Sequence, residues 1–288
     1  MVVQFSCLLF KLGWCTMNSF IKSCCWIFGF CLLGSAGVQA QDTFRLGIAP
    51  HTSARVILEM YQPLREHLEK ALGMPVEVVT APDFTEFARH LLHQDYDLAV
   101  TTGNQARLAE TDANYIPLVT YSAEFKAVAL VAEKGPIKTA ADLKDKVILG
   151  LSPTSLVTLW GQHWMIKNGL NQPLRYVSAS DSVANIVLEG QAAAGFTSMA
   201  NYQSLTPEVQ AQLRLLVTSE PMAGRVYVLN SSQVSRKATI DAALQSFAQS
   251  EEGKAYFAKY KLKGYRKLLP KELNSMDSFT AETRQSLK

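Results

Sequence analysis

Residues 44–80 read FRLGIAPHTSARVILEMYQPLREHLEKALGMPVEVVT, and they contain two short apolar runs separated by a long amphipathic segment. Between Ala54 and Leu72 the apolar residues recur at intervals of three and four, which is the spacing of a helix with one buried face. Gly73 and Pro75 follow, and this pair is a common signal for the end of a helix. The stretch therefore predicts a β-α-β unit, which is the building block of a parallel sheet.

The same alternation of strands and helices continues in two series along the chain. Further strands of the first series are expected at 97–101, 116–121 and 127–132. A second series begins after Gly135. Its strands are expected at 146–150, 175–178 and 193–197, and its longest helix at 154–168. This order predicts an α/β protein with two halves, each built on a mostly parallel sheet flanked by helices.

The first 40 residues differ in composition from the remainder. All five cysteines lie within the first 31 residues, and Lys11 and Lys22 are the only charged residues of the first 40. A short segment from Met17 to Lys22, an apolar run and the cleavage site Val38-Gln39-Ala40 have the arrangement of a secretory signal peptide. We therefore predict a signal peptide at residues 1–40, with Met17 as an alternative start of translation.

The alternative is that this leader stays in the bilayer as a retained membrane anchor. The apolar run is shorter than the length of about 20 residues that a spanning helix needs, and no second apolar span follows Ala40. Export by a cleaved signal peptide predicts a periplasmic location. Since no cysteine follows residue 31, the exported chain is expected to fold without disulfides.

The overall composition excludes two classes of protein. Hydrophobic residues make up 48% and charged residues 18% of the sequence, which is typical of a folded chain rather than a disordered one. The formal net charge is +3, and it falls to +1 without the two lysines of the leader. Such a balance does not favour nucleic acid or an anionic membrane surface as the partner.

Two segments place hydroxyl groups where a strand leads into a helix. Ser152-Pro-Thr-Ser155 and Thr101-Thr102-Gly103-Asn104 each follow a predicted strand and open a predicted helix. The free N–H groups and the positive dipole end of a helix N-terminus bind small oxyanions. The alternative is that these residues are ordinary N-caps, with Gly103 selected for its backbone freedom.

Several stretches along the chain together resemble a known family through their order and spacing. They are FRLGIAP at 44–50, LREHLEKALG at 64–73, APDF at 81–84, DLAVTTG at 97–103, IKTAADLKDK at 137–146, SPTS at 152–155, SASD at 178–181, LEG at 188–190 and SEEG at 250–253. On these stretches the sequence resembles the phosphate/phosphite/phosphonate-type substrate-binding proteins of ABC importers. That family has the two-lobed type II periplasmic binding fold.

The resemblance implies a chain that crosses twice between two lobes. Lobe one is expected to comprise residues 41–121 plus 219–288, and lobe two residues 127–216. The two crossings, near 121–126 and 217–221, are expected to act as hinges. The ligand is then expected between the lobes, which close around it.

The resemblance and the helix-end argument together give the candidate ligand-binding residues. They are Thr154, Ser155, Ser152, Thr101, Thr102, Gly103, Asn104, Arg107, Phe84, Asp181, Ser180, His51 and Thr52. Arg107 is included because a cation in the first turn of a helix opposes the helix dipole, which favours a compensating anion beside it. Three positions depart from the pattern of the family: Phe84 replaces a tyrosine, Asp181 replaces a histidine, and Ala193 replaces an acid. These departures leave the identity of the ligand open.

These observations predict a periplasmic binding protein that captures a phosphate, phosphite or phosphonate-like oxyanion and delivers it to an ABC permease of the inner membrane. One alternative is a ligand sensor of the same fold that serves a membrane kinase. An enzyme is the other alternative, although the sequence holds no G-x-S-x-G, H-E-x-x-H, P-loop or G-x-G-x-x-G motif. We therefore expect a monomer that binds its ligand reversibly, with no catalytic residue, cofactor, metal or nucleic-acid partner.

Overall fold

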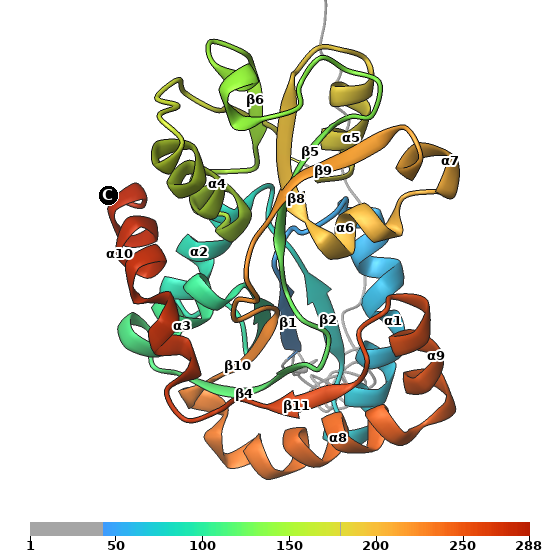
Figure 1. Cartoon of the computed structure of the whole chain (residues 1–288). Coiled ribbons are helices and arrows are strands. Elements are labelled where there is room, and N and C mark those ends of the chain that lie inside the picture. The colour runs from blue at the N-terminus through green and yellow to red at the C-terminus, as the bar shows by residue number, and fades with distance from the viewer. Residues whose placement is uncertain (1–42, 179) are drawn as a thin grey trace, which may run out of the picture. The chain divides into compact units, whose positions relative to one another are not determined.

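The computed structural model describes residues 43–178 and 180–288 of the chain (Figure 1). The predicted signal peptide, with Met17 and all five cysteines, lies outside these described residues, and so does Ala179. Within them the strands form two sheets, one of six strands and one of five. None of the described helices is long and apolar enough to cross a membrane.

The six-stranded sheet has the strand order β11-β4-β10-β3-β1-β2. Its strands are β1 (Phe44–Ile48), β2 (Val76–Val79), β3 (Leu98–Thr101), β4 (Tyr115–Tyr121), β10 (Val226–Asn230) and β11 (Tyr265–Lys267). Strand β1 pairs in parallel with β2 and β3, whereas β10 pairs antiparallel with β3 and β4, and β11 antiparallel with β4. Strands β1 to β4 therefore run in one direction, and β10 and β11 run in the other.

The five-stranded sheet repeats this plan with the order β7-β6-β8-β5-β9. Its strands are β5 (Ala127–Ala132), β6 (Ile148–Gly150), β7 (Arg175–Tyr176), β8 (Ala194–Ser198) and β9 (Leu213–Thr218). Strand β6 pairs in parallel with β7 and β8, and β5 lies antiparallel between β8 and β9. The predicted α/β class with mostly parallel strands is confirmed.

Helices cover both faces of each sheet. The α-helices are α1 (Ala54–Leu72), α2 (Phe84–Leu92), α3 (Gly103–Asp112), α4 (Leu156–Lys167), α5 (Ser180–Leu188), α6 (Met199–Ser204), α7 (Pro207–Gln210), α8 (Lys237–Gln249), α9 (Glu251–Lys259) and α10 (Asp277–Ser286). Three short 3₁₀ helices are η1 (Ala140–Leu143), η2 (Ser231–Arg236) and η3 (Glu272–Met276). Helices α1, α8 and α9 pack on one face of the six-stranded sheet and α2 and α3 on the other, while α4 and α5 take opposite faces of the five-stranded sheet.

Helix α1 forms and ends as its sequence predicts. Its buried residues, which include Ile57, Leu64 and Leu68, repeat at helical spacing and face the six-stranded sheet. Gly73 has a φ of 65°, and its N–H donates to the carbonyl of Glu69 at 3.0 Å. This left-handed residue closes the helix in a conformation that favours glycine.

Two chain crossings join the sheets and lie side by side. Residues 122–126 connect β4 to β5, and residues 219–225 connect β9 to β10. Phe125 and Met222 form an antiparallel bridge, in which the Met222 N–H donates to the Phe125 carbonyl at 2.9 Å. Ser219 adds two bonds of 2.9 Å with Ala127, since its N–H donates to the Ala127 carbonyl and its hydroxyl accepts from the Ala127 N–H.

Five tyrosines of the six-stranded half share a buried hydrogen-bonded cluster. The Tyr121 hydroxyl lies 2.7 Å from that of Tyr256, 2.8 Å from that of Tyr227 and 3.4 Å from that of Tyr61. The Tyr227 hydroxyl in turn lies 3.0 Å from that of Tyr265. Burial raises the pKa of all five phenols, so each is neutral at physiological pH. The cluster therefore joins α1, α9, β4, β10 and β11 through neutral hydrogen bonds.

Replacement of Tyr121 by phenylalanine should lower the free energy of unfolding by about 1–3 kcal/mol, because it leaves buried hydroxyls without their shared partner. Denaturant titration measures this change. Tyr176→Phe on the exposed strand β7 is the matched control and should change stability little. Equal effects of the two substitutions would show that the cluster contributes nothing.

Candidate ligand-binding site

A small cavity lies where the two sheets approach each other. Its volume is about 20 Å³, which is the space of about one water molecule. Both halves and both crossings contribute to its wall, which is formed by Ala49, His51, Phe84, Val100, Thr101, Thr102, Phe125, Leu151, Ser155, Val157, Ser198, Asn201 and Arg225. The cavity thus brings together five of the predicted ligand residues, namely His51, Phe84, Thr101, Thr102 and Ser155.

The N-terminus of α4 opens into this cavity. Ser155 is the N-cap residue of α4, but its hydroxyl makes no capping bond. Val157, in the first turn of the helix, also lines the cavity. The unpaired N–H groups of a first turn and the positive end of the helix dipole favour an anion at this position.

Ser152 and Thr154 lie behind Ser155 rather than on the cavity wall. The Oγ of Ser152 is buried and has no hydrogen-bond partner among residues 43–178 and 180–288. Thr154 is fully buried, and its carbonyl accepts a bond of 2.9 Å from Asn104 Nδ2 on the opposite half. The Thr154 Oγ1 also lies 3.3 Å from the Oγ1 of Thr85. Thr154 therefore joins the two halves.

The hydroxyls of Thr101 and Thr102 belong to the cavity wall but donate elsewhere. Thr101 Oγ1 donates to Gln105 Oε1 at 2.9 Å, and Thr102 Oγ1 donates to Asn104 Oδ1 at 2.8 Å. A hydroxyl whose hydrogen is used in this way offers only lone pairs to a ligand. In this arrangement the two threonines shape the wall without donating to an anion.

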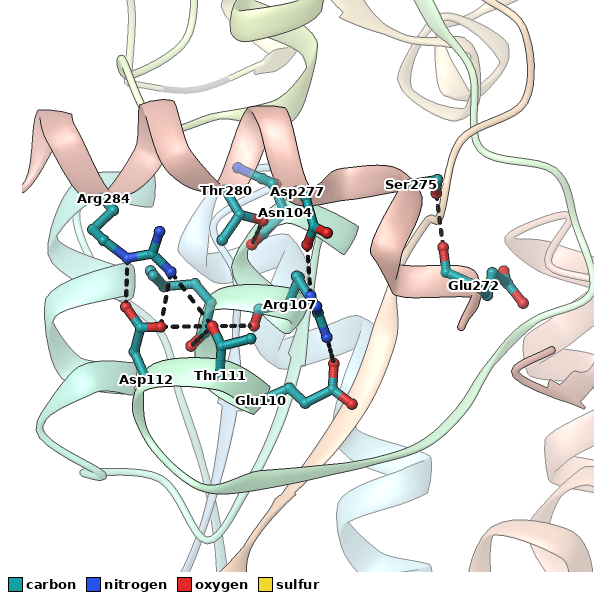
Figure 2. A network of polar contacts seen from close by, with 11 residues as sticks. Asn104, Arg107, Glu110, Thr111, Asp112, Glu272, Ser275, Asp277, Thr280 and Arg284 are labelled. Atoms are coloured by element: carbon teal, nitrogen blue, oxygen red, sulfur yellow. Dashed lines mark hydrogen bonds and ion pairs between the residues drawn. The ribbon is translucent and has the colours of Figure 1, made fainter. Parts of the chain in front are cut away.

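Asn104 does not line the cavity and links the two halves instead. Its Nδ2 donates to the Thr154 carbonyl and to Thr283 Oγ1, both at 2.9 Å. The Asn104 carbonyl accepts a bond of 3.0 Å from Thr280 Oγ1 of α10, which Figure 2 shows. A fully buried amide with these partners positions both α4 and α10.

A glycine is required at position 103 because the backbone of the second crossing lies very close to it. A backbone conformation that favours glycine is not the reason. Its φ does not lie in the left-handed region. A Cβ atom at this position would lie 2.5 Å from the carbonyl oxygen of Ala223, in the second crossing. The interpretation that Gly103 serves backbone freedom is therefore wrong, and its small size lets the first turn of α3 contact the crossing.

Arg107 finds its compensating anion within the protein. Its Nε donates to Asp277 at 2.7 Å and its Nη1 to Glu110 at 2.9 Å (Figure 2). Arg284 of α10 makes a two-bond pair with Asp112 at 2.7 and 2.8 Å. These ion pairs fix α10 on α3, and Arg107 is not part of the cavity wall.

The remaining predicted residues, Ser180, Asp181 and Thr52, do not line the cavity. Ser180, at the start of α5, donates its hydroxyl hydrogen to the His51 carbonyl on the opposite half. Asp181 is exposed and lines neither this cavity nor the cleft beside it. Thr52 lines that neighbouring cleft.

His51 presents a hydrogen-bond acceptor that has no partner. Its Nδ1 lies 2.9 Å from the carbonyl oxygen of Ala49, which places the proton of a neutral ring on Nδ1. The Nε2 is buried and has no hydrogen-bond partner in the part of the chain that the structure describes. Burial lowers the pKa of His51 well below its usual value, and the charge of Arg225 lowers it further. The ring is therefore neutral, and Nε2 can accept a hydrogen from a ligand.

Arg225 is the cation of the cavity, and no motif pointed to it. Within the described residues its guanidinium has no hydrogen bond or ion pair, although its backbone carbonyl accepts a bond of 3.0 Å from Thr120. A partly buried guanidinium normally has an acceptor, because its loss of water is otherwise uncompensated. The sequence did contain one signal, since Arg225 is the only charged residue between Glu220 and Arg236.

Among the described residues, the cavity between the two α/β halves thus has a cation without a bonded partner and a helix N-terminus on its wall, two features that favour a negative group. The sequence matches the family described as "ABC transporter, phosphonate, periplasmic substrate-binding protein" over residues 46–273. The chain belongs to this family, whose proteins are periplasmic and bind substrates for ABC transporters. No match was found among curated protein sequences.

Solved structures show the same fold. A binding protein component of an ABC phosphonate transporter from Pseudomonas aeruginosa has a TM-score of 0.75 and 16% identity, over 86% of this chain and 89% of that one. PhnD1 from Prochlorococcus marinus, in complex with methylphosphonate, has a TM-score of 0.75 and 15% identity, over 85% and 99%. A histidine kinase sensor domain has a TM-score of 0.53 and 13% identity, over 79% and 99%.

Asn104→Ala should destabilise the protein by about 2–3 kcal/mol, because the buried Thr154 carbonyl and Thr283 hydroxyl lose a shared donor. Chemical denaturation measures the change. Asn171→Ala, at an exposed position, is the control and should have almost no effect. If Asn104→Ala were as stable as this control, the link between the halves would carry no free energy.

Proposed function

We propose that this protein captures a small oxyanion of the phosphate, phosphite or phosphonate type in the cavity and delivers it to an ABC permease. The unpaired guanidinium of Arg225 is the observation that carries the proposal. The N-terminus of α4, with Ser155, lines the same cavity. A guanidinium and a helix N-terminus that face one small space both favour a negative ligand with several acceptor oxygens.

His51 adds a preference for the protonated form of the ligand. The Nε2 accepts hydrogen bonds only, as long as the ring is neutral. A monoprotonated oxyanion can donate its hydroxyl hydrogen to this nitrogen while its other oxygens accept from Arg225 and α4. A fully deprotonated anion has no hydrogen to donate, so His51 could bond to it only after the imidazole takes up a proton from solvent, which the lowered pKa of His51 opposes.

Ligand binding requires the two halves to move apart and then to close around a cavity larger than this one. The cavity has room for about one water molecule, whereas a tetrahedral oxyanion has at least four heavy atoms. We take residues 41–121 plus 219–288 as lobe one and residues 127–216 as lobe two, with hinges near 121–126 and 217–221. The contacts between Asn104 and Thr154 and between Ser180 and His51 then hold the closed state.

The partners follow from this role. We propose that a monomer with a leader cleaved after Ala40 meets an ABC permease at the inner membrane. The fold is shared with a histidine kinase sensor domain, so a sensor role for the same site is the second candidate. Both roles use reversible binding of the ligand without covalent chemistry.

Arg225→Gln should weaken binding of phosphate, phosphite or methylphosphonate about 10- to 100-fold, since a hydrogen bond to a charged group contributes about 1.5–3 kcal/mol. Isothermal titration calorimetry on protein that begins at Gln41 measures the affinity. Arg107→Gln is the matched control, and its affinity should equal that of the wild type because Arg107 pairs with Asp277 and Glu110. Wild-type affinity in Arg225→Gln, or a loss in Arg107→Gln, would contradict the proposed site.

The affinity should fall as the pH rises from about 6 to 9, because the ligand loses its hydrogen and the lowered pKa of His51 keeps the ring neutral. The groups that face the ring are the Arg225 guanidinium and the Tyr61 ring, whose centroid is 6.2 Å away. Calorimetry at several pH values measures this slope. In His51→Gln the slope should be shallower, and an unchanged slope would remove His51 from the site.

A further inference from the structure

A second, larger cleft opens directly beside the cavity. Its volume is about 920 Å³, and it shares His51, Phe125, Asn201 and Arg225 with the cavity wall. Helix α1, both crossings, α6 and the segment 259–263 after α9 form its sides. A ligand held at Arg225 can therefore extend into this cleft without leaving the cavity.

The cleft is strongly basic although the rest of the protein is not. Five cations line it, and Glu124 is its only acid, whereas the chain without its leader carries a net charge of only +1. The lining cations are Lys126, Arg225, Lys259, Lys261 and Lys263. Lys126 forms an ion pair with Glu124 at 2.8 Å, and the charge of Lys263 also contributes to lowering the pKa of Glu124.

The segment 259–263 holds its lysines in a particular backbone conformation. Lys261 and Lys263 have φ angles of 55° and 61°, in the left-handed region that residues other than glycine, asparagine and aspartate seldom adopt. The Lys261 ammonium donates to the Gln203 carbonyl at 3.2 Å, while the Lys259 ammonium lies 5.2 Å from the centroid of the Tyr260 ring. Lysine thus occupies two positions where glycine would be less strained.

We propose that the natural ligand carries a second anionic group, which this basic cleft binds. The inference rests on the proposed function, because the first anionic group is the phosphoryl group held at Arg225. The ligand class is an organic phosphonate or phosphate ester with a carboxylate or a further phosphate on its substituent. A volume of about 920 Å³ also lies in the range of sites for ligands much larger than phosphate.

Two pairs of probes test the cleft separately from the cavity. Phosphonoacetate and 3-phosphonopropionate carry a carboxylate, and ethylphosphonate and propylphosphonate are their counterparts without it. The wild type should bind the carboxylate probes about tenfold more tightly at low ionic strength, and this advantage should shrink as salt is added. Calorimetry in low and high salt gives both affinities.

Lys259→Gln with Lys263→Gln should abolish the advantage and leave the affinity for the alkylphosphonates unchanged. Lys70→Gln with Lys167→Gln removes the same charge outside both cavities and should keep the advantage. Lys263→Gly is a second test variant. Glycine adopts the left-handed conformation of this position without strain, so we expect the fold to be preserved. Its affinity for the carboxylate probes should fall.

Equal affinity of the wild type for both probe types would overturn the inference, and so would an advantage that survives in the Lys259→Gln, Lys263→Gln variant. In either case the alkylphosphonates still bind, and the proposed oxyanion site stands. Absence of binding for all four probes would instead overturn the proposed function itself.

Discussion

The paired chain crossings are the constraint on which the rest of the site depends. The bridge between Phe125 and Met222, with the bonds of Ser219 to Ala127, keeps the two connections together. The first crossing leads into β5 and the second into β10. Each of these strands runs antiparallel to both of its neighbours in the sheet. The parallel strands β3 and β6 consequently end on opposite sides of one cavity, and the helices that follow them begin there. Ligand sites of α/β proteins generally form at such strand ends.

Buried polar contacts then hold the halves in register on the side away from the basic cleft. Asn104 reaches Thr154 in one direction and α10 in the other. Helix α10 also contacts α4, where Glu282 bonds to His163 at 2.7 Å and the Phe279 ring stacks on the His163 ring. Since Arg107 and Arg284 already fix α10 on α3, this helix contacts both halves. If the halves separate as we propose, the contacts of α10 with α4 must break, whereas its ion pairs with α3 can persist.

Features that depend on neighbouring residues were predicted from the sequence. Contacts between residues that lie far apart along the chain were not. The β-α-β unit, the position of Gly73 and the hydroxyls beside α3 and α4 follow from periodicity and turn residues within short windows. Arg225 could not be placed, because its role depends on the geometry of a crossing and not on its neighbours in sequence. From the sequence, Arg107 was expected to pair with an anionic ligand. Its actual partner, Asp277, lies 170 positions away and could not be recognised from neighbouring residues. The pattern of residues 265–288 likewise predicted neither β11 nor α10, because each is defined by contacts with β4 or α3.

The distribution of charge shows how a nearly neutral protein could select an anion, as we propose. A basic surface attracts any polyanion at long range, and salt screens that attraction. In this protein the cation that matters is a single guanidinium in a cavity with room for about one water, beside a neutral imidazole. A charge in such a place would interact strongly with a ligand that replaces its missing acceptor. The lysines of the adjoining cleft lie in a larger space that excludes less water, so the preference that we propose for them depends on salt and does not determine which group enters the cavity. In the proposed function, selection by protonation therefore belongs to the cavity, and selection by total charge belongs to the cleft.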